Sequence, residues 1–130
     1  MKILLWIVQV LLAVAFLAHG VMMLVPSPSV ALQMNALLPR WFQLFLGVAE
    51  VAAAIGVTVP GVTRIQPRLV PMAAFGIMVV MTSATILHAS RGEYSAVATT
   101  LVLLLLSTFV AWQRWSVRPI SAREARVSKV

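Results

Sequence analysis

The charged residues of this chain are widely spaced, and long apolar stretches lie between them. No charge occurs among the 37 positions between Lys2 and Arg40, and Glu50 is the only charged residue in the next 23 positions. Two more uncharged stretches cover residues 69–90 and 94–113, which are 22 and 20 residues long. A helix needs about 20 apolar residues to cross the hydrocarbon layer of a membrane. The pattern therefore predicts several membrane-spanning helices.

The prolines sharpen the ends of these helices, because proline disrupts a helix interior but fits in a first turn. They stand at positions 26, 28, 39, 60, 67, 71 and 119, and we expect none of them inside a spanning helix. Pro71 then falls in the first turn of the third helix. The predicted spans are Ile3–Val25, Trp41–Val59, Val70–Ser90 and Tyr94–Trp112. They predict an all-α fold, an integral membrane bundle of four antiparallel helices.

A cleaved signal peptide is the alternative explanation of the first span. Lys2 would form its basic start, and the sequence LAHG would be a poor cleavage site. The apolar run continues past that site through VMMLV, which favours an uncleaved span.

The composition excludes several classes of protein. Hydrophobic residues make up 62% of the chain and charged residues 10%, whereas a soluble domain carries about 25% charged residues. The apolar content is also far too high for a disordered chain. With no cysteine, the chain has no disulfide, no thiolate zinc site and no thiol chemistry. The net charge of +7 points in an apolar chain to membrane topology rather than to nucleic acid.

The basic residues are distributed unevenly about the predicted spans. With four spans, both termini and the loop at 60–69 lie on one side of the membrane. That side holds eight basic residues, namely Lys2, Arg64, Arg68, Arg114, Arg118, Arg123, Arg126 and Lys129, and the other side holds Arg40 and Arg91. Cytoplasmic loops are enriched in Lys and Arg, so both termini are predicted to be cytoplasmic. We divide the chain into a membrane domain at 1–115 and a basic cytoplasmic tail at 116–130, which lies in solvent or along lipid headgroups.

The external connection at 26–40 is unusually apolar. Ser29 is a candidate N-cap for a short helix over Val30–Leu38, which would lie flat over the outer end of the bundle. A disordered crossover is the alternative, and the sequence does not decide between the two.

Ionisable residues inside the predicted spans are costly and therefore candidates for function. They are His19, Glu50 and His88, on three different helices. At 1.5 Å per residue, they lie about 9, 14 and 3 Å from the outer ends of their helices, all in the outer half. Thr82 and Thr85 lie near His88 and can add hydroxyl groups to the same cavity. These five residues are the predicted ligand-binding site.

Each of these residues also has a purely structural explanation. Glu50 would then be a protonated carboxyl group bonded to a neighbouring helix, and His88 an interfacial residue at a helix end. A haem held by His19 and His88 is disfavoured, because their depths differ by about 6 Å. No catalytic or metal-binding motif is present, so we assign no catalytic residue and no metal ligand.

Three segments of the sequence together resemble the DoxX-like family of small four-helix bacterial membrane proteins. The resemblance covers about residues 10–115 and rests on AFLAHGVMML, on the Gly47-x-x-Glu50 motif with the following Ile55-Gly56-x-x-x-Pro60, and on Ala84-x-x-x-His88 before an RGE turn. It implies a multi-pass protein of the bacterial inner membrane and supports Glu50 and His88 as family positions. His19 matches no motif of the family.

The resemblance also suggests two functions. Relatives include a membrane subunit of a thiosulfate:quinone oxidoreductase and a membrane partner in an oxidant-defence complex, while distant relatives assist the assembly of other membrane proteins. The first hypothesis is a redox-associated membrane subunit that binds a quinone-like molecule around Glu50 and His88, beside an oxidoreductase partner or in a homo-oligomer. The second is a non-enzymatic membrane scaffold or assembly chaperone.

Overall fold

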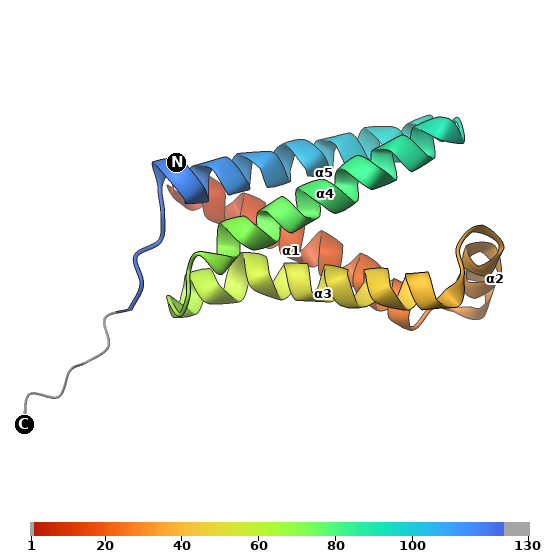
Figure 1. Ribbon diagram of the computed structural model, residues 1–130, viewed down its shortest axis with the longest axis horizontal. Coiled ribbons are helices and arrows are strands. Elements are labelled where there is room, and N and C mark those ends of the chain that lie inside the picture. The colour runs from red at the N-terminus through yellow and green to blue at the C-terminus, as the bar shows by residue number, and fades with distance from the viewer. Residues whose placement is uncertain (1, 124–130) are drawn as a thin grey trace, which may run out of the picture.

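The computed structural model describes residues 2–123, which form helices joined by short connections (Figure 1). The elements are α1 (Lys2–Leu24), α2 (Pro28–Leu37), α3 (Arg40–Thr63), α4 (Leu69–Ser90), α5 (Tyr94–Trp112) and a π-helical segment η1 (Gln113–Val117). Within this part of the chain, four helical stretches are long and apolar enough to cross a membrane: α1, α3, α4, and α5 with η1. The prediction of an all-α bundle of four apolar helices is confirmed.

The side of the membrane that holds the termini stays a prediction. Two of the basic residues on which it rests, Arg126 and Lys129, lie outside the described residues, as does the tail beyond residue 123. We therefore refer to the two ends of the bundle by their contents. The N-terminal end holds the start of α1, the α3–α4 connection and η1, and the opposite end holds α2 and the α4–α5 turn (Figure 1).

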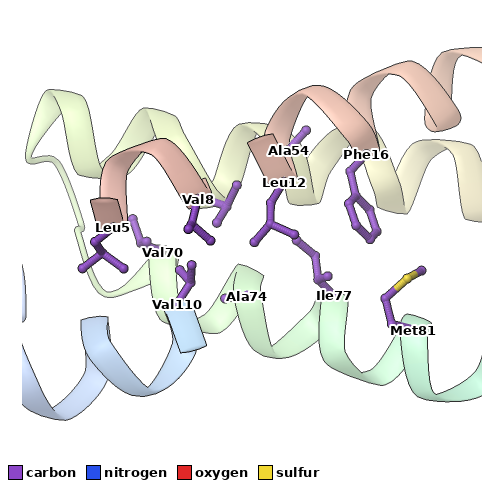
Figure 2. Packing of buried hydrophobic residues seen from close by; sticks show 11 residues of the cluster. Leu5, Val8, Leu12, Phe16, Ala54, Val70, Ala74, Ile77, Met81 and Val110 are labelled. Atoms are coloured by element: carbon purple, nitrogen blue, oxygen red, sulfur yellow. The ribbon is translucent and has the colours of Figure 1, made fainter. Parts of the chain in front are cut away.

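The helices form two hairpins, in which α1 packs along α3 and α4 packs along α5 (Figure 1). The hydrophobic core lies where the hairpins cross, and Figure 2 shows its side chains meeting between α1 and α4. Its residues are Leu5, Val8, Leu12, Phe16, Ala54, Val57, Val70, Ala74, Ile77, Met81 and Val110. Met81 is the last buried residue of α4, although the helix continues to Ser90. The hairpins therefore share a core near the N-terminal end and diverge towards the other end.

One expectation about proline is wrong, because Pro60 lies inside α3. The predicted span ended at Val59, but the helix continues to Thr63. Proline removes one backbone hydrogen bond from a helix, and in a membrane protein neighbouring helices can satisfy the freed carbonyl groups. The carbonyl group that loses its partner belongs to Gly56, four residues before the proline. The side chain of Gln9 donates from Nε2 to the next carbonyl oxygen, that of Val57, at 2.7 Å. By contrast, Pro71 lies in the first turn of α4, as expected.

The apolar connection contains a short helix, which is one of the two alternatives that the sequence left open, but the candidate cap is wrong. Helix α2 begins at Pro28, with Ser27 at the N-cap position and no side-chain cap hydrogen bond, so Ser29 lies inside the helix. Proline favours the first helical position because its fixed φ suits the helix and it has no N–H group to leave unpaired. Gln43, which is fully buried, anchors the far end of α2 by donating to the side chain of Asn35 and to the carbonyl oxygen of Leu38.

The described part of the C-terminal tail docks against the α3–α4 connection. Arg64 ends α3 in a left-handed backbone conformation, and its side chain donates to the carbonyl oxygen of Ser121 at 3.0 Å and to its hydroxyl group at 2.8 Å. The backbone N–H of Arg123 donates back to the carbonyl oxygen of Arg64 at 2.9 Å. This part of the predicted tail thus lies against the bundle.

Candidate functional site

An imidazole–carboxylate pair joins α1 to α3. His19 Nδ1 lies 2.7 Å from Oε2 of Glu50, across a sequence separation of 31 residues. The structure thus brings together two of the three ionisable residues that the sequence placed in the spans. The contact is a hydrogen bond when a single proton lies between Nδ1 and Oε2. It is also an ion pair when the imidazole is protonated and the carboxyl group is ionised.

Two glycines allow α1 and α3 to cross closely beside this pair. A Cβ atom on Gly20 would lie 3.0 Å from the carbonyl oxygen of Gly47 and 3.1 Å from Cβ of Glu50. A Cβ atom on Gly47 would in turn lie 3.0 Å from the carbonyl oxygen of Gly20. In lipid, small residues permit such close backbone approach. The crossing therefore brings His19 within reach of Glu50.

The two partners differ strongly in exposure. The side chain of Glu50 is 3% exposed, whereas that of His19 is 46% exposed. Because Nδ1 of the ring meets the carboxylate, Nε2 is the nitrogen through which His19 can meet another molecule. A buried carboxylate that binds one ring nitrogen sets the orientation and the tautomer of the imidazole and leaves its other nitrogen for a second partner. The pair can therefore accept or donate a proton at the surface of the α1–α3 hairpin.

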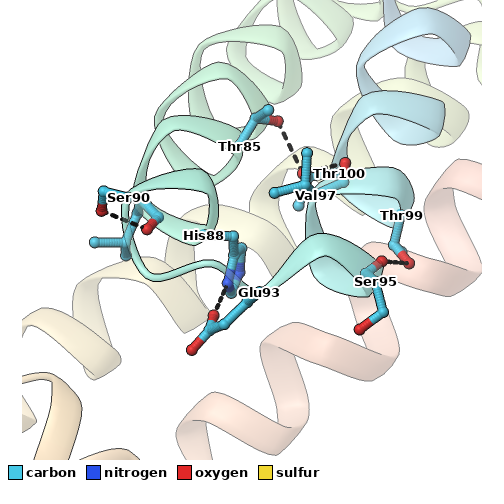
Figure 3. Close-up of polar contacts among 9 residues, drawn as sticks. Thr85, His88, Ser90, Glu93, Ser95, Val97, Thr99 and Thr100 are labelled. Atoms are coloured by element: carbon cyan, nitrogen blue, oxygen red, sulfur yellow. Dashed lines mark hydrogen bonds and ion pairs between the residues drawn. The ribbon is translucent and has the colours of Figure 1, made fainter.

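His88 belongs to a second pair of the same chemistry. Its Nδ1 hydrogen-bonds Oε2 of Glu93, at the turn that joins α4 to α5 (Figure 3). The two side chains are both partly exposed. The backbone N–H of Glu93 also donates to the carbonyl oxygen of His88 at 3.0 Å, which closes the turn. His88 therefore pairs within its own hairpin, and Glu50 pairs with His19.

The two threonines of the predicted site bond within the α4–α5 hairpin. Thr85 donates to the carbonyl oxygen of Met81 at 2.7 Å and lies 2.8 Å from the hydroxyl oxygen of Thr100 on α5 (Figure 3). Thr82 donates to the carbonyl oxygen of Met78 at 2.8 Å. Thr85 thus links the two helices of the hairpin, whereas the hydrogen bond of Thr82 stays within α4.

Several buried polar residues were not among the predicted site residues. They are Gln9, Gln43, Thr100, Ser107, Gln113 and Arg114. Gln9 and Gln43 each interrupt an apolar run, and this interruption is the signal by which the sequence could have revealed them. Arg114 was instead assigned to the cytoplasmic surface, because a basic residue just beyond a span usually reaches solvent.

A groove of about 540 Å³ lies on the exposed face of the α4–α5 hairpin, near the N-terminal end of the bundle. Apolar and aromatic side chains form most of its lining, which consists of Pro71, Met72, Phe75, Met78, Thr108, Ala111, Trp112, Trp115 and Ser116. None of the five predicted site residues contributes to it.

Comparison with known protein families matches residues 7–110 to the DoxX-like family. The matched segment starts early in α1 and ends in α5, so it covers all four spanning helices. The chain belongs to the DoxX-like family. A search among curated proteins and another among solved structures found no match. This DoxX-like chain is therefore a multi-pass membrane protein with four candidate spans, in contact with the lipid bilayer.

Proposed function

We propose that this DoxX-like protein binds a small amphipathic molecule of the quinone class at the His19–Glu50 pair, as a membrane subunit associated with redox processes. The observation that carries the proposal is the asymmetry of the pair, since a half-exposed imidazole is held by a carboxylate that is 3% exposed. A buried acid in a membrane helix is costly and therefore usually functional.

The chemistry of the pair suits a ligand with a carbonyl or hydroxyl group. Nε2 of His19 can hydrogen-bond such an oxygen, and Glu50 behind it can stabilise the imidazolium form when the ring carries an extra proton. The apolar side chains around the imidazole would contact the rest of the molecule. The electrons of a redox reaction would come from a partner protein, and this pair would serve binding and proton exchange at the ligand oxygen.

The geometry gives less support to the other predicted site residues. His88, Thr82 and Thr85 have their observed hydrogen-bond partners inside the α4–α5 hairpin. The proposal therefore relies on His19 and Glu50, and it treats a role for His88 as the competing arrangement.

The two imidazole–carboxylate pairs provide a matched test. Protein purified gently from native membranes is extracted with organic solvent, the extract is analysed for quinones by mass spectrometry, and binding of a short-chain ubiquinone is titrated. We expect Glu50→Gln and His19→Phe to lose the bound molecule and to weaken titrated binding, whereas Glu93→Gln retains both. Loss in Glu93→Gln alone would move the site to His88. Absence of any bound or titratable quinone in the wild-type protein would refute the proposal.

A second candidate function, a scaffold for partner membrane proteins, is favoured by the groove on the α4–α5 hairpin. Its aromatic and methionine side chains and the nearby exposed Gly76 would suit close packing of a partner helix. A photo-crosslinking residue at Phe75, in native membranes, should then capture a stoichiometric partner, whereas one at the exposed Phe45 of α3, on the other hairpin, should not. No difference between the two positions would exclude docking at this groove.

A further inference from the structure

The N-terminal end of the bundle buries a cation. Arg114, in η1, is only 9% exposed, and its Nε donates to Oε1 of Gln9 on α1 at 2.6 Å. Gln9 is itself fully buried and donates to the carbonyl oxygen of Val57 on α3. The guanidinium carbon lies 4.9 Å from the ring centre of Trp6. Arg114 thus bonds η1 to α1, and Gln9 continues the hydrogen bonds to α3.

The contacts around this charge leave it without a full negative counterpart among the described residues. Two of the acidic residues, Glu50 and Glu93, pair with histidines, and the third, Glu124, lies outside the described residues. The indole face of Trp6 and the C-terminal end of α5 supply partial negative charge. A buried charge in an apolar interior is normally paired with an opposite one.

Two buried polar atoms of η1 have no hydrogen-bond partner within residues 2–123. They are Nη2 of Arg114 and Oε1 of Gln113, and both are enclosed. The residues are consecutive and both buried, at the start of the π-helical segment. Such segments often occur at functional sites. Unsatisfied buried polar atoms in a native structure call for a partner.

We propose that Arg114 and Gln113 form a binding site for a phosphate-class oxyanion, separate from the His19–Glu50 pair. Guanidinium groups match phosphate and carboxylate oxygens in geometry, and charge-assisted hydrogen bonds of this kind are strong. A phosphate that retains a proton also offers a donor to Oε1 of Gln113. The oxyanion can come from a lipid headgroup at this end of the membrane or from free phosphate in the aqueous phase.

The C-terminal segment covers this end of the bundle. Cδ1 of Ile120 and Cη2 of Trp6 each lie 3.0 Å from where a Cβ atom on Gly61 would be, so all three residues meet closely. The bonds between Arg64 and Ser121 hold the segment in place. Entry of an oxyanion therefore requires this segment to move aside or the headgroup to enter beside it.

The test uses the full chain in a maltoside detergent, which contains no phosphate. Three probes are added separately: inorganic phosphate, phosphatidylglycerol, and diacylglycerol, which has the same acyl chains but no phosphate. Thermal unfolding reports binding, because a ligand of the folded state raises the unfolding temperature. Trp fluorescence gives a second readout, with Trp6→Phe as the control that removes the local signal.

We expect a phosphate-bearing probe to stabilise the wild-type protein and Arg114→Gln to bind it roughly tenfold more weakly. Arg118→Gln removes a charge from the same segment and should bind as the wild type does. Arg114→Lys keeps the positive charge but lacks the planar guanidinium group, and we expect intermediate binding. This variant also provides a readout if Arg114→Gln does not fold. A response to phosphatidylglycerol alone assigns the site to lipid headgroups, whereas a response to inorganic phosphate assigns it to an aqueous anion.

Three results would overturn the proposal. The first is no response of the wild-type protein to either phosphate-bearing probe. The second is an equal loss of binding in Arg114→Gln and Arg118→Gln, which would indicate general electrostatic attraction. The third concerns stability in the absence of any probe. If Glu124→Gln is destabilised as much as Arg114→Gln, and the double variant loses no further stability, the two residues form an internal ion pair.

Discussion

Arg40, the first residue of α3, caps the last residue of α1, because its Nη2 donates to the carbonyl oxygen of Leu24 at 2.8 Å. Its Nη1 donates to the carbonyl oxygen of Met23 at 2.9 Å. The final carbonyl groups of a helix have no partner within the helix, and leaving them unpaired near lipid is costly. A single side chain therefore closes α1 and sets the spacing between α1 and α3 at this end.

We predict that Arg40→Ala loosens the α1–α3 hairpin at the end of the bundle that holds α2. Loss of these charge-assisted bonds should cost about 1–3 kcal/mol and speed amide hydrogen exchange in the last turn of α1. Hydrogen-exchange mass spectrometry in lipid nanodiscs measures this effect. The control is Arg91→Ala at the exposed α4–α5 turn, and equal exchange of α1 in both variants would show that Arg40 is not a cap.

A second prediction concerns the glycine crossing of α1 and α3. In Gly20→Ala the new methyl group would lie 3.0 Å from the backbone oxygen of Gly47, which cannot move easily. We expect a loss of about 1–3 kcal/mol in the free energy of unfolding. Gly76→Ala is the matched control, because a Cβ atom there meets nothing within 4 Å. Thermal unfolding in detergent compares the two, and similar stability of both variants would contradict the role of the crossing.

The third prediction is energetic coupling between His19 and Glu50. Removing the imidazole in His19→Leu leaves the carboxyl group buried without its partner, which should cost about 1–3 kcal/mol. The double variant with Glu50→Leu removes both polar groups, and an apolar pair of this kind is well tolerated in an apolar setting. We therefore expect the double variant to be more stable than the sum of the single variants indicates. Additive effects in a denaturant-unfolding cycle would show that the contact carries no coupling.

The fourth prediction tests the orientation in the membrane. Because the chain contains no cysteine, single cysteines report accessibility without background labelling. We expect a membrane-impermeant maleimide to label Gln33→Cys, on α2, in intact cells and to label Gln66→Cys, in the α3–α4 connection, only after lysis. Both positions are exposed in the structure. The reverse labelling pattern would place both termini outside.

The spacing of charges was enough to predict the helices of this fold, because a helix in lipid must satisfy its own backbone and exclude charge. Details that depend on how the helices pack against one another could not be predicted from the sequence. Pro60 lies within α3, where α1 packs against it and Gln9 donates to the carbonyl oxygen of Val57, and the sequence alone does not show that α1 is the neighbour.

In the candidate site, too, the sequence predicted the residues but not their partners. Counting residues from the helix ends predicted that His19, Glu50 and His88 lie in one half of the membrane, but the partner of each residue depends on how the helices cross. Glu93, just outside a span, had no assigned role, although it is the partner of His88. The buried position of Arg114 likewise depends on the path of η1 and on the contact with Gln9. The residues next to Arg114 in the sequence indicate neither.

The half-exposed imidazole of His19 lies on a helix that runs within the apolar layer, five residues before the end of α1. A molecule that reaches it would therefore travel sideways through the bilayer, rather than down an aqueous funnel. Its supply would be set by its partition coefficient, and each additional buried methylene raises that partitioning by about 0.8 kcal/mol. A compound scarce in water could thus be plentiful where this side chain meets it.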